Sequence, residues 1–227
     1  MFVALFIQLN IMKKIPLFLL LLFAIGSCKK EKLDANDIGG DTNIALTEVG
    51  RQSSVYLNMG GSYVSGSMVV TSNNGGIVNY HLVANLTGNP DSAMIAGLVP
   101  AEFKNPQGEI EADFKFKITS EGIVDFFIDQ KPRLLVKYDD NVGAAYSFTA
   151  TDGNNFVRTI TEKTGIDEWP LGWMLIKTVK VEEDLPANDY NVTSVTYRAN
   201  HKFGLVYIEA ATSLGATISM DIYPQGL

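Results

Sequence analysis

From Val55 to the end of the chain, apolar and polar residues alternate with a period of two. Because this period puts successive side chains on opposite faces, it indicates β-strands with one buried face. It is clearest in residues 78–86, 114–118, 146–150, 179–181 and 218–222. In the second of these runs, Phe114, Phe116 and Ile118 are expected in the core, and Lys115 and Lys117 in solvent. No comparable window shows a helical period, so strands are expected to organise the fold.

Turn chemistry separates these runs. Residues that tolerate positive φ occur at 73–76, 121–122, 140–143, 152–153 and 202–204. Three pairs of runs lie close enough along the chain for antiparallel hairpins: 114–118 with 124–128, 134–138 with 144–150, and 195–197 with 205–208. This organisation predicts an all-β fold, an antiparallel β-sandwich or a barrel-like sandwich built of hairpins, and not a parallel sheet with crossover helices.

The amino-terminal region has the plan of an export signal. Lys13 and Lys14 precede an uncharged apolar run from Ile15 to Ile25, and small residues then lead to Cys28, the only cysteine in the chain. As a helix, this run covers about 16 Å, roughly half of a ~30 Å hydrocarbon core. A permanent membrane anchor is the alternative, because residues 1–11 add further apolar side chains, although polar residues interrupt the combined stretch. We interpret residues 1–11 as an extension upstream of a true start at Met12.

The segment Ile25-Gly26-Ser27-Cys28 resembles the lipobox of bacterial lipoproteins of the Bacteroidota type. The resemblance implies that residues 1–27 are a lipoprotein signal peptide. It also implies a thioether-linked diacylglyceryl group on Cys28 and acylation of its new amino terminus. One acyl chain anchors only marginally, whereas two or three hold a protein firmly on a membrane. The expected location is the outer membrane, at its periplasmic face or, if residues 29–32 act as a surface signal, at the cell surface.

Composition divides the rest of the chain into a tether and a domain. Residues 28–47 are polar without an apolar period, which predicts a flexible tether. Residues 48–227 are expected to form a single β-sandwich-type domain, or two small β subdomains. Without residues 1–27, sixteen basic and 25 acidic residues remain, a net charge of −9. An acidic surface repels phosphate backbones, so no nucleic-acid partner is expected.

No motif identifies an enzyme. The segment 60–64 (Gly-Gly-Ser-Tyr-Val) lacks the last glycine of the G-x-S-x-G elbow. His81 and His201 are interpreted as solvated surface residues, and the Asx-rich segments 139–141 and 152–155 as turns. We therefore predict no catalytic residue, no metal site and no cofactor.

Two acidic groups leave a hydrolase open as an alternative. Glycosidases with all-β folds use a pair of carboxylates and carry no sequence signature for them. The candidate groups are Glu109, Glu111 and Asp113, and the run Glu182-Glu183-Asp184. Because both groups lie at strand ends, we expect solvated acidic rims, and a polysaccharide hydrolase using a carboxylate pair is the alternative function.

Both tryptophans lie in the segment Trp169-Pro170-Leu171-Gly172-Trp173. This segment either packs over an open end of the fold or forms an exposed aromatic platform. If the neighbouring loops lie at the same end, Trp169, Trp173, His201 and Phe203 form a candidate binding surface for a protein or glycan partner. The leading prediction is thus a non-catalytic binding or accessory lipoprotein. Asp91-Ser92-Ala93 also resembles the O-glycosylation site of the same phylum, with Ser92 as the acceptor.

Overall fold

The computed structural model describes residues 38–226 except for 94, 96–98, 100, 166–167 and 187–190. In this part of the chain, two 3₁₀ turns accompany fourteen strands. The turns are η1 (Ala45–Thr47) and η2 (Ala101–Phe103). The strands are β1 (Gln52–Met59), β2 (Ser62–Asn74), β3 (Ile77–Ala84), β4 (Ile110–Thr119), β5 (Gly122–Asp125), β6 (Arg133–Lys137), β7 (Ala145–Thr149), β8 (Asn155–Lys163), β9 (Trp169–Leu171), β10 (Met174–Ile176), β11 (Val179–Asp184), β12 (Val192–Asn200), β13 (Gly204–Thr212) and β14 (Thr217–Pro224). None of the helices among these residues is long and apolar enough to cross a membrane.

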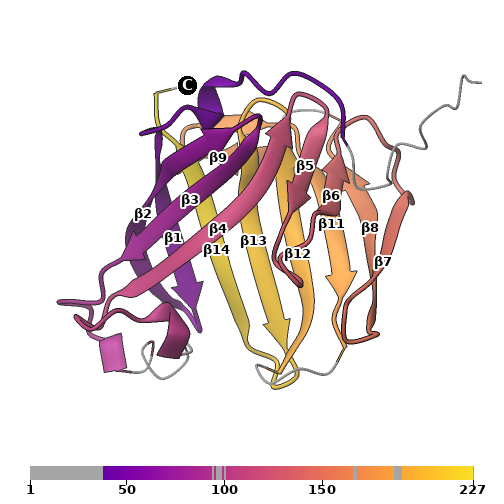
Figure 1. Ribbon diagram of the computed structural model, residues 1–227. Coiled ribbons are helices and arrows are strands. Elements are labelled where there is room, and N and C mark those ends of the chain that lie inside the picture. The colour runs from indigo at the N-terminus through magenta and orange to yellow at the C-terminus, as the bar shows by residue number, and fades with distance from the viewer. Residues whose placement is uncertain are drawn as a thin grey trace, which may run out of the picture. The chain divides into compact units, whose positions relative to one another are not determined.

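Twelve of these strands form one antiparallel sheet in the order β6-β5-β4-β3-β2-β1-β14-β13-β12-β11-β8-β7. Strands β1 and β14 pair in the middle, so the two ends of the strand series meet there. The sheet curves back on itself, so that β4 and β5 lie in front of β13 and β12 in the view of Figure 1. The predicted all-β antiparallel class is confirmed, in its barrel-like form: one nearly closed sheet.

Two of the three predicted hairpins are confirmed, β4 with β5 and β12 with β13. The hairpin of 134–138 with 144–150 is wrong, because β6 and β7 are the two edges of the sheet. The loop between them crosses from one unpaired edge to the other. We call the line where these two edges, β6 and β7, face each other the seam. There the Tyr146 hydroxyl donates to Asp140 at 2.9 Å and accepts from the Lys137 backbone N–H at 3.2 Å. A short turn-rich link therefore joins two edges instead of two paired neighbours.

The period of two places the core as predicted along most of β3 and β4. Val78, Tyr80 and Leu82 are buried on one face of β3, and Phe116 (4% exposed) and Ile118 are buried on β4. Phe114 is only half-buried, although it was expected in the core. The cause is a hollow inside the sheet, which Phe114 lines.

The packed domain includes residues that were assigned to the tether. Ile38 is buried against Val124 of β5, Phe126 directly after β5 and Leu134 of β6. Leu46, in η1, joins the main core. These two apolar residues are eight positions apart within a polar stretch, so no periodic pattern marked them. Among the described residues, the packed part begins by residue 38 and not at residue 48.

Candidate functional site

A cavity of about 780 Å³ opens at one end of the curved sheet. Of the connections at this end, β3–β4, β5–β6, β7–β8 and β11–β12 contribute residues to the wall. Of the sixteen described lining residues, four are polar or charged: Asp152, Asn154, Arg158 and Glu183. The apolar and aromatic lining residues are Phe103, Phe114, Phe127, Ile128, Phe156, Leu185, Pro186, Val192, Val195, Tyr197, Ile208 and Ala210. We call this cavity the groove.

Strand geometry explains why the groove is apolar. Alternate residues of β12 and β13 point inward, which brings Val195 and Tyr197 opposite Ala210 and Ile208. At the rim, Phe103 and Phe127 are 41% and 36% exposed. Exposed aromatic side chains beside an apolar hollow are typical of a binding site for an apolar ligand.

A buried ionic cluster interrupts this apolar wall. Arg158 on β8 donates from Nη1 to Asp125 Oδ2 at 2.5 Å and from Nε to Glu183 Oε2 at 3.0 Å. Nη1 also donates to the Leu134 carbonyl oxygen at 3.2 Å, and the Tyr197 hydroxyl donates to Glu183 Oε2 at 3.3 Å. Arg158 and Asp125 are fully buried, and Glu183 is 1% exposed. We call Asp125, Arg158 and Glu183 the buried triad.

The triad contains two acids for one base. Burial raises the pKa of Asp125 and of Glu183, and the nearby Arg158 guanidinium offsets only part of this shift. Burial alone would lower the pKa of Arg158, but the negative charges around it outweigh this effect and the net shift is upward. Arg158 therefore stays charged, and each of the two carboxyl groups binds a proton more readily than it would in water.

Two atoms of the triad have no hydrogen-bond partner among the described residues: Arg158 Nη2 and Glu183 Oε1. Both residues line the groove, whereas Asp125 does not. Asp125 Oδ1 accepts from the Phe127 backbone N–H at 3.0 Å, and Oδ2 accepts from Arg158. The wall of the groove thus contains two buried side chains that each carry one atom without a hydrogen-bond partner among the described residues, a donor on Arg158 and an acceptor on Glu183.

Glu183 corrects the expectation of a solvated acidic rim at 182–184. It is buried, whereas Asp184 is exposed and Glu182 is half-buried on the outer face. The parity of β11 gives the reason, because Glu183 continues the inward series of Val179 and Val181. Arg158 likewise stands between the inward-facing Phe156 and Ile160. The sequence signal for this site was therefore a charged residue at a position where the alternation of the strand predicts a buried apolar one.

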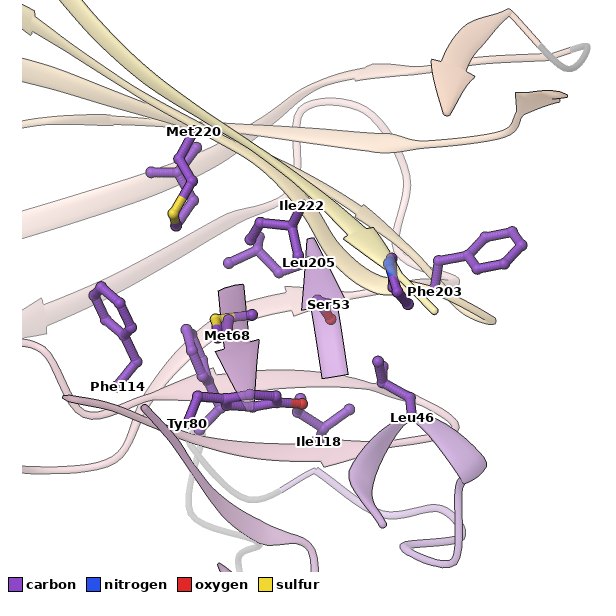
Figure 2. A pocket seen from close by; sticks show the side chains of 13 residues that line it. Leu46, Ser53, Met68, Tyr80, Phe114, Ile118, Phe203, Leu205, Met220 and Ile222 are labelled. Carbon is purple, nitrogen blue, oxygen red and sulfur yellow. The ribbon is translucent and has the colours of Figure 1, made fainter. Parts of the chain in front are cut away.

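A second, much smaller cavity of about 20 Å³ lies in the core. Its wall is apolar and includes Leu46 of η1, Met68, Tyr80 and Met220 (Figure 2). Phe114 and Ile208 line both this inner cavity and the groove. These two side chains therefore form the partition between the groove and the inner cavity.

The structure places the tryptophan segment in a small hairpin, β9–β10, separate from the large sheet. Gly172 has φ +62°, which suits the first central position of a type II′ turn and leaves Trp173 at the tip, 92% exposed. Trp169 is half-buried, with its ring 5.2 Å from that of Tyr207 and 4.2 Å from the guanidinium carbon of Arg198. The hairpin thus presents one tryptophan to solvent and packs the other.

The other members of the candidate surface divide in the same way. Phe203 is buried in a cluster with Leu171 and Ile176 of the hairpin, and His201 is exposed at the β12–β13 turn. Phe203 therefore fixes the hairpin to the sheet and offers no surface to a partner. Whether Trp173 and His201 bind anything stays a prediction.

The remaining candidates lie outside the groove. His81 is half-buried on the outer face, with Nδ1 2.9 Å from Asp113 Oδ1. Ser92 is half-buried in the β3–β4 connection. Cys28 lies outside the described residues. Within the described residues, no group of three or more histidine, cysteine, aspartate or glutamate side chains is placed to hold a metal ion.

No protein-family model matches the sequence, and no curated protein is significantly similar to it. Among solved structures, a protein of Bacteroides fragilis with a YmcC-like fold, for which export has been suggested, is similar at 7% identity and TM-score 0.46. That match covers 79% of this chain and 97% of the other. A hypothetical protein of Chlamydia trachomatis matches at 9% identity and TM-score 0.36, over 83% and 92% of the two chains. A Vibrio parahaemolyticus domain, suggested to belong to an outer membrane lipoprotein-sorting protein, matches at 8% identity and TM-score 0.26, over 81% and 89%. Likeness at this level carries no functional conclusion.

Proposed function

We propose that this chain is a non-catalytic binding protein of the bacterial cell envelope whose groove takes up the acyl chain of an amphiphilic molecule. The observation that supports this function is the groove itself, which is wide, open at one end and lined mainly by aliphatic and aromatic side chains. Its volume of about 780 Å³ falls within the ~300–1,000 Å³ of typical small-molecule sites.

The energy for such binding comes from burial of apolar surface. Each buried methylene contributes roughly 0.8 kcal/mol, so a ten-carbon chain offers several kcal/mol after the cost of association is subtracted. Phe103 and Phe127 at the rim gain further apolar contact when a chain is present. A ligand of this kind therefore matches both the shape and the chemistry of the groove.

A glycan ligand or a hydrolase is less well supported. A sugar presents many hydroxyl groups, whereas only four of the sixteen described lining residues are polar or charged. Asp125 and Glu183 share one guanidinium, which brings two carboxyl groups close together. However, both oxygens of Asp125 are already bonded and this residue does not line the groove. The pair is therefore poorly placed to act as an acid and a base on a substrate.

Filling the groove tests the proposal. Ala210 on β13 lines the groove, and Ala211 is the next residue on the opposite face of the same strand. We expect Ala210→Trp to reduce binding of the neutral fluorescent probe N-phenyl-1-naphthylamine by at least about tenfold, which is roughly 1.4 kcal/mol. Ala211→Trp is expected to bind like the wild type. Equal binding by both variants, or no binding by the unmodified chain, would refute the proposal.

The envelope location rests on the lipobox-like segment that ends in Cys28. We expect Cys28→Ala to release the protein from membranes while the domain keeps its fold, because every described strand begins after residue 51. Detergent-phase partitioning of the wild type and the variant measures this. A variant that stays in the membrane fraction at high salt would show that something other than a lipid on Cys28 holds the protein.

A further inference from the structure

The buried triad gives the groove a polar point, and the following inference rests on the proposed function. Arg158 Nη2 and Glu183 Oε1 belong to side chains that line the groove and are 0% and 1% exposed. Each atom lacks a hydrogen-bond partner among the described residues. Buried polar atoms without a protein partner are rare in folded proteins, and a molecule bound in the groove could complete the two that belong to its wall.

The other atoms of the two side chains are already committed, which fixes the free atoms in place. Arg158 Nη1 is held by Asp125 and the Leu134 carbonyl oxygen, and Nε is held by Glu183. Glu183 Oε2 accepts from Arg158 and from the Tyr197 hydroxyl. A free donor and a free acceptor that are held in this way need little reordering when a ligand binds.

We propose that Arg158 Nη2 and Glu183 Oε1 bind the head group of an acyl compound that carries both a carbonyl acceptor and a donor, namely a carboxamide or an un-ionised carboxylic acid. The carbonyl oxygen accepts from Arg158 Nη2, and the N–H or O–H donates to Glu183 Oε1. The acyl chain then runs along the apolar wall formed by Phe156, Val195 and Ala210.

Charge and hydrogen-bonding capacity exclude other head groups. Two acids already face one guanidinium, so an anionic head adds further negative charge to a buried site. A cationic head could approach Glu183 but would be repelled by Arg158. An ester accepts a hydrogen bond but has no donor, and it would leave Glu183 Oε1 unpaired. An amide satisfies both atoms without adding charge.

Four ligands with the same chain length separate these cases: decanamide, decanoic acid, methyl decanoate and decylamine. Each is used to displace N-phenyl-1-naphthylamine from the full-length chain carrying Cys28→Ala, in the absence of detergent. We expect decanamide to bind about fivefold to tenfold more tightly than methyl decanoate, the difference that one additional buried hydrogen bond provides. At pH 8, decanoic acid is ionised in water and should bind more weakly than decanamide.

The variant Glu183→Gln tests whether the head group meets this residue. A glutamine side chain can offer an N–H to the groove, so the ester is expected to bind at least as tightly as the amide. Glu182→Gln, on the outer face of the same strand, should keep the wild-type order of affinities. If Glu183→Gln does not fold, Tyr197→Phe provides the second test. It removes the hydroxyl that holds Glu183 Oε2 and should reduce the preference for the amide.

Failure of this inference can be told apart from failure of the proposed function. If decanamide and methyl decanoate bind the wild type equally well, the groove binds acyl chains and the polar anchor is refuted. If decylamine binds most tightly, the site prefers a cationic head group, and the polar anchor is also refuted. If none of the four ligands displaces the probe, the proposed function itself is wrong.

Discussion

Arg158 on β8 donates from Nη1 to Asp125 on β5 at 2.5 Å, across the interior of the curved sheet. These strands belong to opposite halves of the sheet, whose edges β6 and β7 are not paired with each other in the described topology. The same side chain also bonds to Leu134 of β6 and to Glu183 of β11. One guanidinium thus links the two halves of the sheet beside the seam, where the edge strands are not joined by backbone hydrogen bonds.

Replacement of this guanidinium should cause a large loss of stability. We expect Arg158→Met to lower the free energy of unfolding by roughly 3–5 kcal/mol, because Asp125 is left buried without its partner. Lys180→Met is the control, since Lys180 pairs with Glu182 on the outer face and such exposed pairs contribute about 0–1 kcal/mol. Urea unfolding of both variants measures the difference. Equal losses would show that the buried triad does not hold the seam.

The triad also predicts how stability depends on pH. Burial raises the pKa of Glu183, so the folded protein holds this proton more tightly than the unfolded chain does. The contribution of Glu183 to the free energy of unfolding should therefore fall as the pH rises from the ordinary glutamate value of 4.5 through the raised value in the folded state. Glu183→Gln lacks this group, so the variant should gain stability relative to the wild type as the pH rises above 4.5.

Glu162 provides a control of opposite sign. Its hydrogen bond from Arg198 lowers its pKa, so its contribution is present above the ordinary value and is lost as the pH falls through the lowered one. Glu162→Gln should therefore lose stability relative to the wild type at neutral pH and recover it in acid. Urea melts at several pH values measure both variants. A wild-type advantage over Glu183→Gln that grows with pH would contradict the assignment.

The strands could be predicted from the sequence because buried and exposed residues alternate along each strand. Phe116 and Ile118 are buried on β4, as the period of two predicts. The groove could not be predicted in this way, because Val195 and Ala210 show the same alternation whether they face a filled core or a hollow. Phe114 illustrates this limit. The alternating pattern predicts that it is a core residue, but in the structure it lines a cavity.

The seam and the polar site depend on contacts between residues that are distant in sequence. The link 139–143 has the chemistry of a hairpin turn, and turn chemistry does not specify whether the flanking strands pair with each other. The partners of Arg158 lie 33 positions before it and 25 positions after it. Parity alone could indicate that Arg158 and Glu183 face inward, but it could not indicate that they meet.

The β9–β10 hairpin gives a prediction about fluorescence. Trp173 is 92% exposed, and Trp169 is covered by Tyr207 and Arg198. Iodide should therefore quench one part of the tryptophan emission strongly and the remainder weakly. Trp173→Phe should remove the strongly quenched part, while Trp169→Phe should leave it. Loss of the quenched part in the Trp169 variant alone would reverse the assignment of the two rings.

The partition between the groove and the inner cavity should set the length of chain that the protein accepts. Phe114 and Ile208 line both spaces, and removal of the Phe114 ring would join them. We expect Phe114→Ala to bind methyl hexadecanoate more tightly than methyl decanoate by a larger factor than the wild type does. Each additional methylene that enters the enlarged space can contribute up to roughly 0.8 kcal/mol.

Stability must be measured alongside affinity, because the truncation also removes core contacts. Phe114 is half-buried, so Phe114→Ala should cost less than the roughly 3–5 kcal/mol expected for the buried Phe116→Ala. Phe127→Ala is the control for affinity. It removes a phenyl ring at the rim of the groove that does not itself line the inner cavity, and should weaken both esters by the same factor. If Phe114→Ala also weakens both esters equally, the two spaces do not act as one site.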